Sequence, residues 1–146
     1  MDSKKFLGSG MKFPIQINKT TGRFAVSSKE TSVKESIYLI LMTQQGERIL
    51  RPSFGSEIMS YTFKDANLTF LSVARRELKD LIMANEPRIS DVLVNVDSTS
   101  RPGYLIFDIE YTVAETNTRD NFVFPYYLNQ NEDEEEGIAY EPVEEV

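Results

Sequence analysis

The chain has 146 residues and contains no histidine, no cysteine and no tryptophan. Without histidine it lacks the usual general base and the base of the common serine triads. Without histidine and cysteine it also lacks the usual zinc ligands, and a disulfide framework is excluded. The longest apolar run, Ile37 to Met42, is far shorter than the roughly 18 residues of a membrane span. These absences disfavour most hydrolases, zinc proteins and membrane-spanning proteins, and no cofactor is expected.

Two short signals are missing as well. Gly8-Ser9-Gly10 is not followed by the lysine, the serine and the helix that a phosphate-binding loop requires. The first residues carry no apolar stretch of the kind found in secretory signals. Synthesis in the cytoplasm is therefore expected.

The acidity of the chain is concentrated at its end. Residues 132–146 hold eight of the 23 acids and no base, so the other 15 acids face 16 lysines and arginines over residues 1–131. A body of nearly zero net charge offers no general basic face, and neither a nucleic-acid partner nor direct membrane contact is expected. A run of like charges is typical of a disordered, solubilising end, with docking on a basic partner as the alternative. We expect a flexible arm over 1–10, one domain over 11–130 and an acidic tail over 131–146.

Two segments have the pattern of helices. Ser32 and Glu35 have the spacing of a capping box, which predicts a helix from Ser32 to near Gly46. A second helix is predicted over Leu68 to Asn85, capped by Asp65 or Asn67. Its apolar residues recur at three- and four-residue steps and predict a buried stripe, made of Leu68, Leu71, Ala74, Leu78, Leu81 and Ile82.

The remaining apolar segments alternate with a period of two, which predicts strands. Phe13 to Asn18 forms one such segment, and a turn at Asn18 to Gly22 leads to a return over Arg23 to Ser27. Three longer strands follow the second helix, around Val92 to Val96, over the run YLIFDIEYTV and over Phe122 to Leu128. The order predicts an α+β domain, a small antiparallel sheet with two main helices packed on one face.

The stretch TQQGERILRPSFG, Thr43 to Gly55, connects the two helices and mixes charged residues with apolar ones. Such a mixture suits a loop that is fixed to a scaffold and offered to a partner, although a well-packed connection with an internal ion pair explains it equally well. Its candidate residues are Gly46, Glu47, Arg48, Arg51, Pro52, Phe54 and Gly55.

Carboxylates are the remaining candidates for catalysis. A glycosidase needs only two carboxyl groups at a suitable separation, and Glu47, Glu57 and Glu86 are available. Each lies next to or near an arginine, which would keep it ionised and make it a poor general acid. A non-enzymatic role is therefore preferred, with a peptidoglycan-cleaving enzyme as the alternative.

Four segments resemble one known family in the same order: FLGSGMKFP, GERILRPSFG, EPR at Glu86 to Arg88, and NFVFPYYL. This is the lysozyme-like baseplate wedge family of contractile phage tails, shared with type VI secretion baseplates and extracellular contractile injection particles. The resemblance covers about residues 6–128. It does not include the acidic tail.

The resemblance implies a fold similar to the inner domain of a tail sheath subunit and a structural place in an assembled bacterial or phage baseplate. It implies that Glu86, Pro87 and Arg88 bind the helical core bundle of other wedge proteins. Strand edges, represented here by Phe122, Val123 and Phe124, would pair with arms of the first sheath ring and template sheath assembly, with the tail tube or hub as a further neighbour. We also expect the Thr43–Gly55 loop to brace the triplet. A free-standing adaptor of the same fold is a third alternative.

Overall fold

The computed structural model describes residues 7–63 and 67–128. Strands at both ends of this region enclose two α-helices and a short 3₁₀ helix, and within it no helix is both long and apolar enough to cross a membrane. In chain order the elements are β1 (Ser9–Met11), β2 (Val26–Ser28), α1 (Lys29–Met42), η2 (Ile58–Phe63), α2 (Leu68–Asn85), β3 (Ile89–Asp97), β4 (Tyr104–Val113) and β5 (Thr118–Tyr127).

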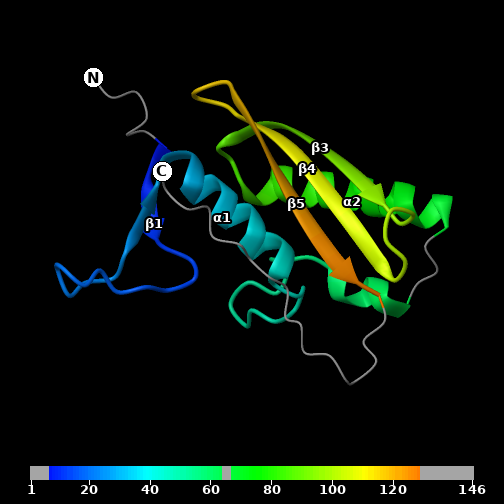
Figure 1. Cartoon of the computed structure of the whole chain (residues 1–146), viewed down its shortest axis with the longest axis horizontal. Helices are drawn as coiled ribbons and strands as arrows, with labels where there is room; N and C mark the ends of the chain where they lie inside the picture. Colours follow the sequence, from blue (N-terminus) through cyan, green and yellow to red (C-terminus); the bar gives the residue numbers. More distant parts are fainter. Residues whose placement is uncertain (1–6, 64–66, 129–146) are drawn as a thin grey trace.

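The main sheet is antiparallel, in the order β3-β4-β5 (Figure 1). Its register is continuous along β4 and β5, and an irregularity interrupts β3 between Ile89 and Asp91. Because successive side chains of a strand point to opposite faces, alternate residues are buried. On β4 these are Leu105, Phe107, Ile109, Tyr111 and Val113, as the alternation predicted.

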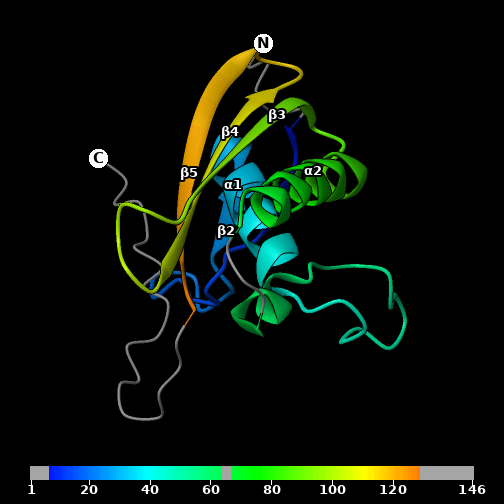
Figure 2. The ribbon, with the colours of Figure 1, turned by 90° about the vertical axis from the view of Figure 1, so that its right-hand side faces the viewer.

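Both α-helices cover the same face of this sheet (Figure 2). Helix α2 packs against β3 and buries Leu71, Ala74, Leu78 and Ile82. Aromatic side chains join α1 to β5: the ring of Tyr38 lies 6.0 Å from that of Phe122 and meets it edge-on. The predicted α+β class, with two helices on one face of an antiparallel sheet, is confirmed.

The start of α2 agrees with the prediction, and the start of α1 does not. Helix α2 has the predicted bounds, and Asn67 caps it by accepting a hydrogen bond from the backbone N–H of Phe70 (2.8 Å). The predicted stripe is wrong at Leu68, which is 84% exposed. Helix α1 begins at Lys29, so Ser32 lies inside it and the predicted capping box is wrong.

Glu35 instead connects α1 to the preceding segment. Its carboxylate accepts hydrogen bonds from the hydroxyl of Ser27 (2.5 Å) and the backbone N–H of Phe13 (3.3 Å). Glu35 and Ser27 are both buried. A buried carboxylate is tolerated where donors reach it, so these bonds fix α1 to the strands before it.

The first strands lie elsewhere than predicted. Strand β1 pairs with β2, whereas the predicted strand over Phe13 to Asn18 contributes one isolated bridge, between Ile17 and Phe24. Pro14 has no N–H to donate to a ladder, and the alternation in this segment marks exposed side chains: Ile17 is 64% exposed. The predicted turn is present, since the side chain of Asn18 accepts two backbone N–H bonds.

The predicted flexible arm over 1–10 is wrong at its end, because Leu7 is buried and β1 begins at Ser9. Residues 1–6 of that arm and the acidic tail over 131–146 lie outside the described residues.

Candidate partner-binding surfaces

Glu86 and Arg88 form an internal ion pair at the junction of α2 and β3. Glu86 ends α2 with φ −122° and ψ 90°, which lies outside the helical region, as expected for a residue before proline. Its carboxylate accepts two parallel bonds from the guanidinium, from Nε at 2.7 Å and from Nη2 at 2.6 Å. Bidentate geometry of this kind gives a strong and directional pair.

The third guanidinium nitrogen of Arg88, which does not contact Glu86, bonds to two further parts of the chain. Its Nη1 donates to the carbonyl of Leu7 (3.0 Å) and to the hydroxyl of Ser32 on α1 (3.2 Å). The backbone carbonyl of Arg88 accepts from Ala114, just after β4. The pair therefore connects the end of α2, the start of β3, the first turns of α1 and the N-terminal segment.

Burial and hydrogen bonding act on Glu86 in opposite directions. Burial alone would raise the pKa of the carboxyl, but hydrogen bonds from Arg88 and Ser36 outweigh it and lower the pKa below its ordinary value of 4.5. The hydrogen bonds to Glu86 in turn raise the pKa of Arg88. Both groups are held in their charged forms.

The guanidinium fork of Arg88 is not open to a carboxylate from a partner. Glu86 is 2% exposed and already occupies that fork. Only about a quarter of the Arg88 side chain, 26%, is exposed. Glu86 and Arg88 therefore stabilise the fold, and only part of the Arg88 side chain is accessible to a partner.

The loop Thr43–Gly55 is held by its own backbone. Its base is closed by bonds between Ser56 N–H and Thr43 C=O (2.8 Å) and between Gln45 N–H and Ser56 C=O (3.0 Å). A third bond crosses it from Gly46 N–H to Pro52 C=O (2.9 Å). The loop thus has a defined conformation without a helix or strand of its own.

Side chains add to this order. The guanidinium of Arg48 lies over the ring of Phe54 at 4.5 Å, and that of Arg51 lies at 5.9 Å, both within cation–π range. The hydroxyl of Ser56 donates to the carbonyl of Leu41 at the end of α1 (2.5 Å).

Gly55 is required where the loop returns. Its φ is +109°, and a Cβ placed there would lie 2.3 Å from the backbone oxygen of Thr43. No L side chain fits so close to a backbone atom.

The predicted bracing of the triplet by this loop is wrong. The triplet bonds to Ser32 near the start of α1, whereas the loop is tied to Leu41 at its end. In Figure 2 the loop extends away from the body beyond the end of α1. The triplet is braced by α1 and the N-terminal segment instead.

The outer edge of β5 is a second candidate surface. Among the described residues β5 pairs with β4 alone. The N–H of Leu128 points toward β4, donating to Gly103 (2.7 Å), so by alternation the N–H groups of odd-numbered residues such as Val123 point outward. Of the predicted edge residues, Phe122 and Phe124 bury their side chains in the core, and Val123 is 54% exposed.

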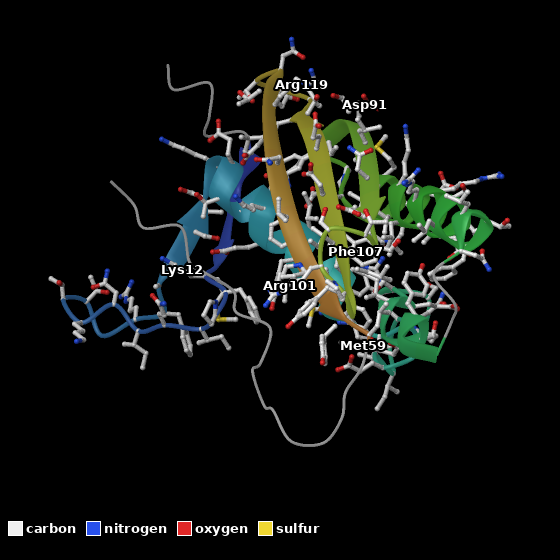
Figure 3. The ribbon with its side chains drawn as sticks, turned by 45° about the vertical axis from the view of Figure 1, so that its right-hand side comes forward. Lys12, Met59, Asp91, Arg101, Phe107 and Arg119 are labelled. Carbon is white, nitrogen blue, oxygen red and sulfur yellow. The ribbon has the colours of Figure 1, made fainter. Side chains whose placement is uncertain are left out.

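The segment around β1 and β2 presents an apolar strip. Met11 pairs with Val26 and Ile17 with Phe24, and facing residues of an antiparallel pair share a face. All four are between 57% and 64% exposed. Residues 9–28 contain three bases and no acid. Figure 3 shows this segment, marked by Lys12, projecting away from the sheet.

The family model for "Baseplate wedge protein gp25" matches residues 27–118, more than half of the chain. The chain belongs to this family. The baseplate wedge protein gp25 of Enterobacteria phage T4 is 27% identical over 84 residues, which cover 58% of this chain and 64% of that protein.

Solved structures share the fold. A crystal structure from Geobacter sulfurreducens, provisionally described as a tail lysozyme, has a TM-score of 0.65 and 41% identity over 73% of this chain and 97% of its own. A chain of the anti-feeding prophage baseplate gives 0.59 at 22% identity, covering 89% and 93%. A chain of a type VI secretion baseplate complex gives 0.55 at 17%, covering 67% and 92%. The chain therefore has the sequence signature of the baseplate wedge family and shares its fold with these chains.

Sequence reasoning missed the groups that surround the triplet. The sequence pattern assigns Ser32 to a helix cap and Leu7 to a flexible arm. Local patterns cannot show a contact between residues that are 81 positions apart, such as Arg88 and Leu7. No local pattern indicates that Ile49 and Leu50 are exposed, because apolar side chains in a loop commonly pack against the core. Within the described residues no group of three or more acidic side chains is placed to hold a metal ion.

Replacing Arg88 by alanine is expected to destabilise the fold by about 3 kcal/mol, because it leaves Glu86 buried without its partner. Because the folded-state pKa of Glu86 is lowered, its stabilisation is complete above pH 4.5 and is lost as pH falls through the folded value. In Arg88→Ala burial dominates and raises the pKa of Glu86, so this variant should gain stability as pH falls. Urea unfolding between pH 3 and pH 7 measures both effects.

The matched control is Arg76→Ala, whose side chain is 86% exposed and lies 3.9 Å from Asp80. It should change stability by less than about 0.5 kcal/mol. Equal unfolding midpoints for the two variants would refute this stabilising role.

Gly55→Ala should lower the unfolding free energy by roughly 2 kcal/mol through strain at a positive φ and the contact with Thr43. Gly10→Ala is the control, since its φ is ordinary and nothing lies within 4 Å of the added Cβ. Thermal melts followed by circular dichroism compare them. A Gly55 variant as stable as the Gly10 variant would show that the loop base relaxes freely.

Proposed function

We propose that this chain is a structural wedge subunit that links the core bundle of the wedge to the first sheath ring and templates sheath assembly. The observation that carries the proposal is the outer edge of β5, a ten-residue strand bonded on one side only among the described residues. An edge of this kind binds an extended segment by adding a strand.

The outer edge of β5 has features that discourage it from pairing before a sheath arm binds. Pro125 removes one outward N–H, and the N–H of Asn121 is engaged by the side chain of Asp120 (2.8 Å). Both features discourage pairing between two free copies of the chain. The outward N–H of Val123 is left for a sheath arm, and the apolar strip on residues 11–26 is the second candidate for this contact.

The surface around Arg88 is the proposed contact with other wedge proteins. The ion pair supports this role by holding α1, Leu7 and the start of β3 in one arrangement, so that little order is lost on docking. The accessible side of Arg88 adds one charge to that surface. The tail tube or hub is a further neighbour in this proposal.

An enzymatic role has weaker support. The carboxylate of Glu86 is buried and is hydrogen-bonded by Arg88 and by Ser36 midway along α1, whereas Glu47 lies in the exposed loop after α1. Glu86 is also held ionised by Arg88, which suits structure and not proton donation.

Val123→Pro tests the strand-addition step. It deletes an outward N–H while keeping the bonds to β4, so the variant should fold and enter baseplates normally. Sheath polymerisation on those baseplates should fall at least tenfold, because the arriving strand loses a bond and meets the proline ring. Electron microscopy counts sheathed particles.

The control is Val123→Thr, which keeps the N–H and the β-branched shape and should give wild-type sheath. Normal sheath on Val123→Pro baseplates would rule out this edge. Failure of the wild-type chain to enter baseplates would rule out the proposed function itself.

A further inference from the structure

The tip of the Thr43–Gly55 loop exposes two large aliphatic side chains next to each other. Ile49 is 93% exposed and Leu50 is 96% exposed. A single exposed leucine is ordinary on a protein surface. An adjacent pair, both almost completely in water at the end of a projecting loop, is the feature that needs explanation.

The loop does not have the conformational freedom that would let its tip fold back. Bonds at its base and across its middle fix the backbone, and Gly55 closes the return against Thr43. Arg48 and Arg51 add contacts with the ring of Phe54. The tip is thus held outward, and a partner that received it would restrict little further motion.

The charges around the tip restrict the partner. Arg48 and Arg51 flank the aliphatic pair directly, and within the described part of the chain neither guanidinium forms an ion pair. The acid next to Arg48 in the sequence, Glu47, accepts the N–H of Gln44 (3.1 Å). The rim of the tip is therefore positive, and a complementary surface is apolar at its centre and acidic at its edge.

We propose that the tip is a plug, in which Ile49 and Leu50 insert into an apolar, acid-rimmed pocket on another protein of the baseplate wedge. This inference rests on the proposed function, since it names a contact within the wedge. A second copy of the same loop is a poor occupant because it would set arginine against arginine. A lipid surface is a poor occupant because two aliphatic residues give a small apolar area.

The plug is separate from the Arg88 surface, which lies at the other end of α1. A subunit that contacts the wedge at two separated points cannot rotate freely. A single contact would allow such rotation. The wedge thereby fixes the direction in which the β5 edge faces the sheath.

The test uses the full chain expressed with its genome's other baseplate wedge proteins, and native mass spectrometry of the purified wedge. Ile49→Ser/Leu50→Ser should reduce incorporation about 100-fold, the loss expected for two aliphatic side chains that no longer bury. Arg51→Glu should reduce it about tenfold, and Arg51→Lys should restore it. Leu68→Ser, at another exposed leucine (84%), is the matched control and should incorporate normally.

A photo-crosslinking amino acid in place of Leu50 identifies the receiving surface. The expected product joins position 50 to an apolar pocket of a wedge protein with Asp or Glu at its rim, and the same probe at position 68 gives no such product. Wild-type incorporation of the double serine variant would overturn the inference, and so would crosslinks to lipid, to sheath or to a second copy. Absence of the wild-type chain from the wedge would instead overturn the proposed function.

Discussion

The ion pair between Glu86 and Arg88 is the constraint on which the rest of the arrangement depends. It lies where α2 turns into β3, and its remaining nitrogen reaches Leu7 and Ser32. A buried charge pair is not inherently a large source of stability compared with apolar packing. What it supplies here is a fixed geometry, because each bond has one partner and one direction.

A second buried carboxylate has a parallel role. Glu35 ties α1 to Ser27 and Phe13, so α1 is fastened on one side to the sheet junction and on another to the first strands. With its layers fixed in this way, the domain directs three features outward: the β5 edge, the apolar strip and the loop tip. Rigid presentation of such features reduces the order that is lost when a partner binds.

The elements with strong periodicity were predictable from the sequence, and the contacts between distant segments were not. Helix α2 has the predicted bounds because Asn67 and Pro87 limit it locally, and β4 follows its alternation because one face packs on the helices. The predicted start of α1 is wrong because Ser32 and Glu35 have the spacing of a capping box, but their side chains accept hydrogen bonds from Arg88 and Ser27 instead. The loop was recognised as unusual, but its partner was misassigned, since position along the chain does not show which end of a helix faces which residue.

Hydrogen exchange of the free chain and of the chain within purified baseplates carrying the first sheath ring tests the central claim most directly. The account predicts that the amides around Arg88 are already protected in the free chain. New protection on assembly should appear at the outward amides of β5, Val123 and Tyr127 among them, and across the Thr43–Gly55 loop. An assembled chain whose β5 edge and loop exchange as fast as in the free protein would contradict it.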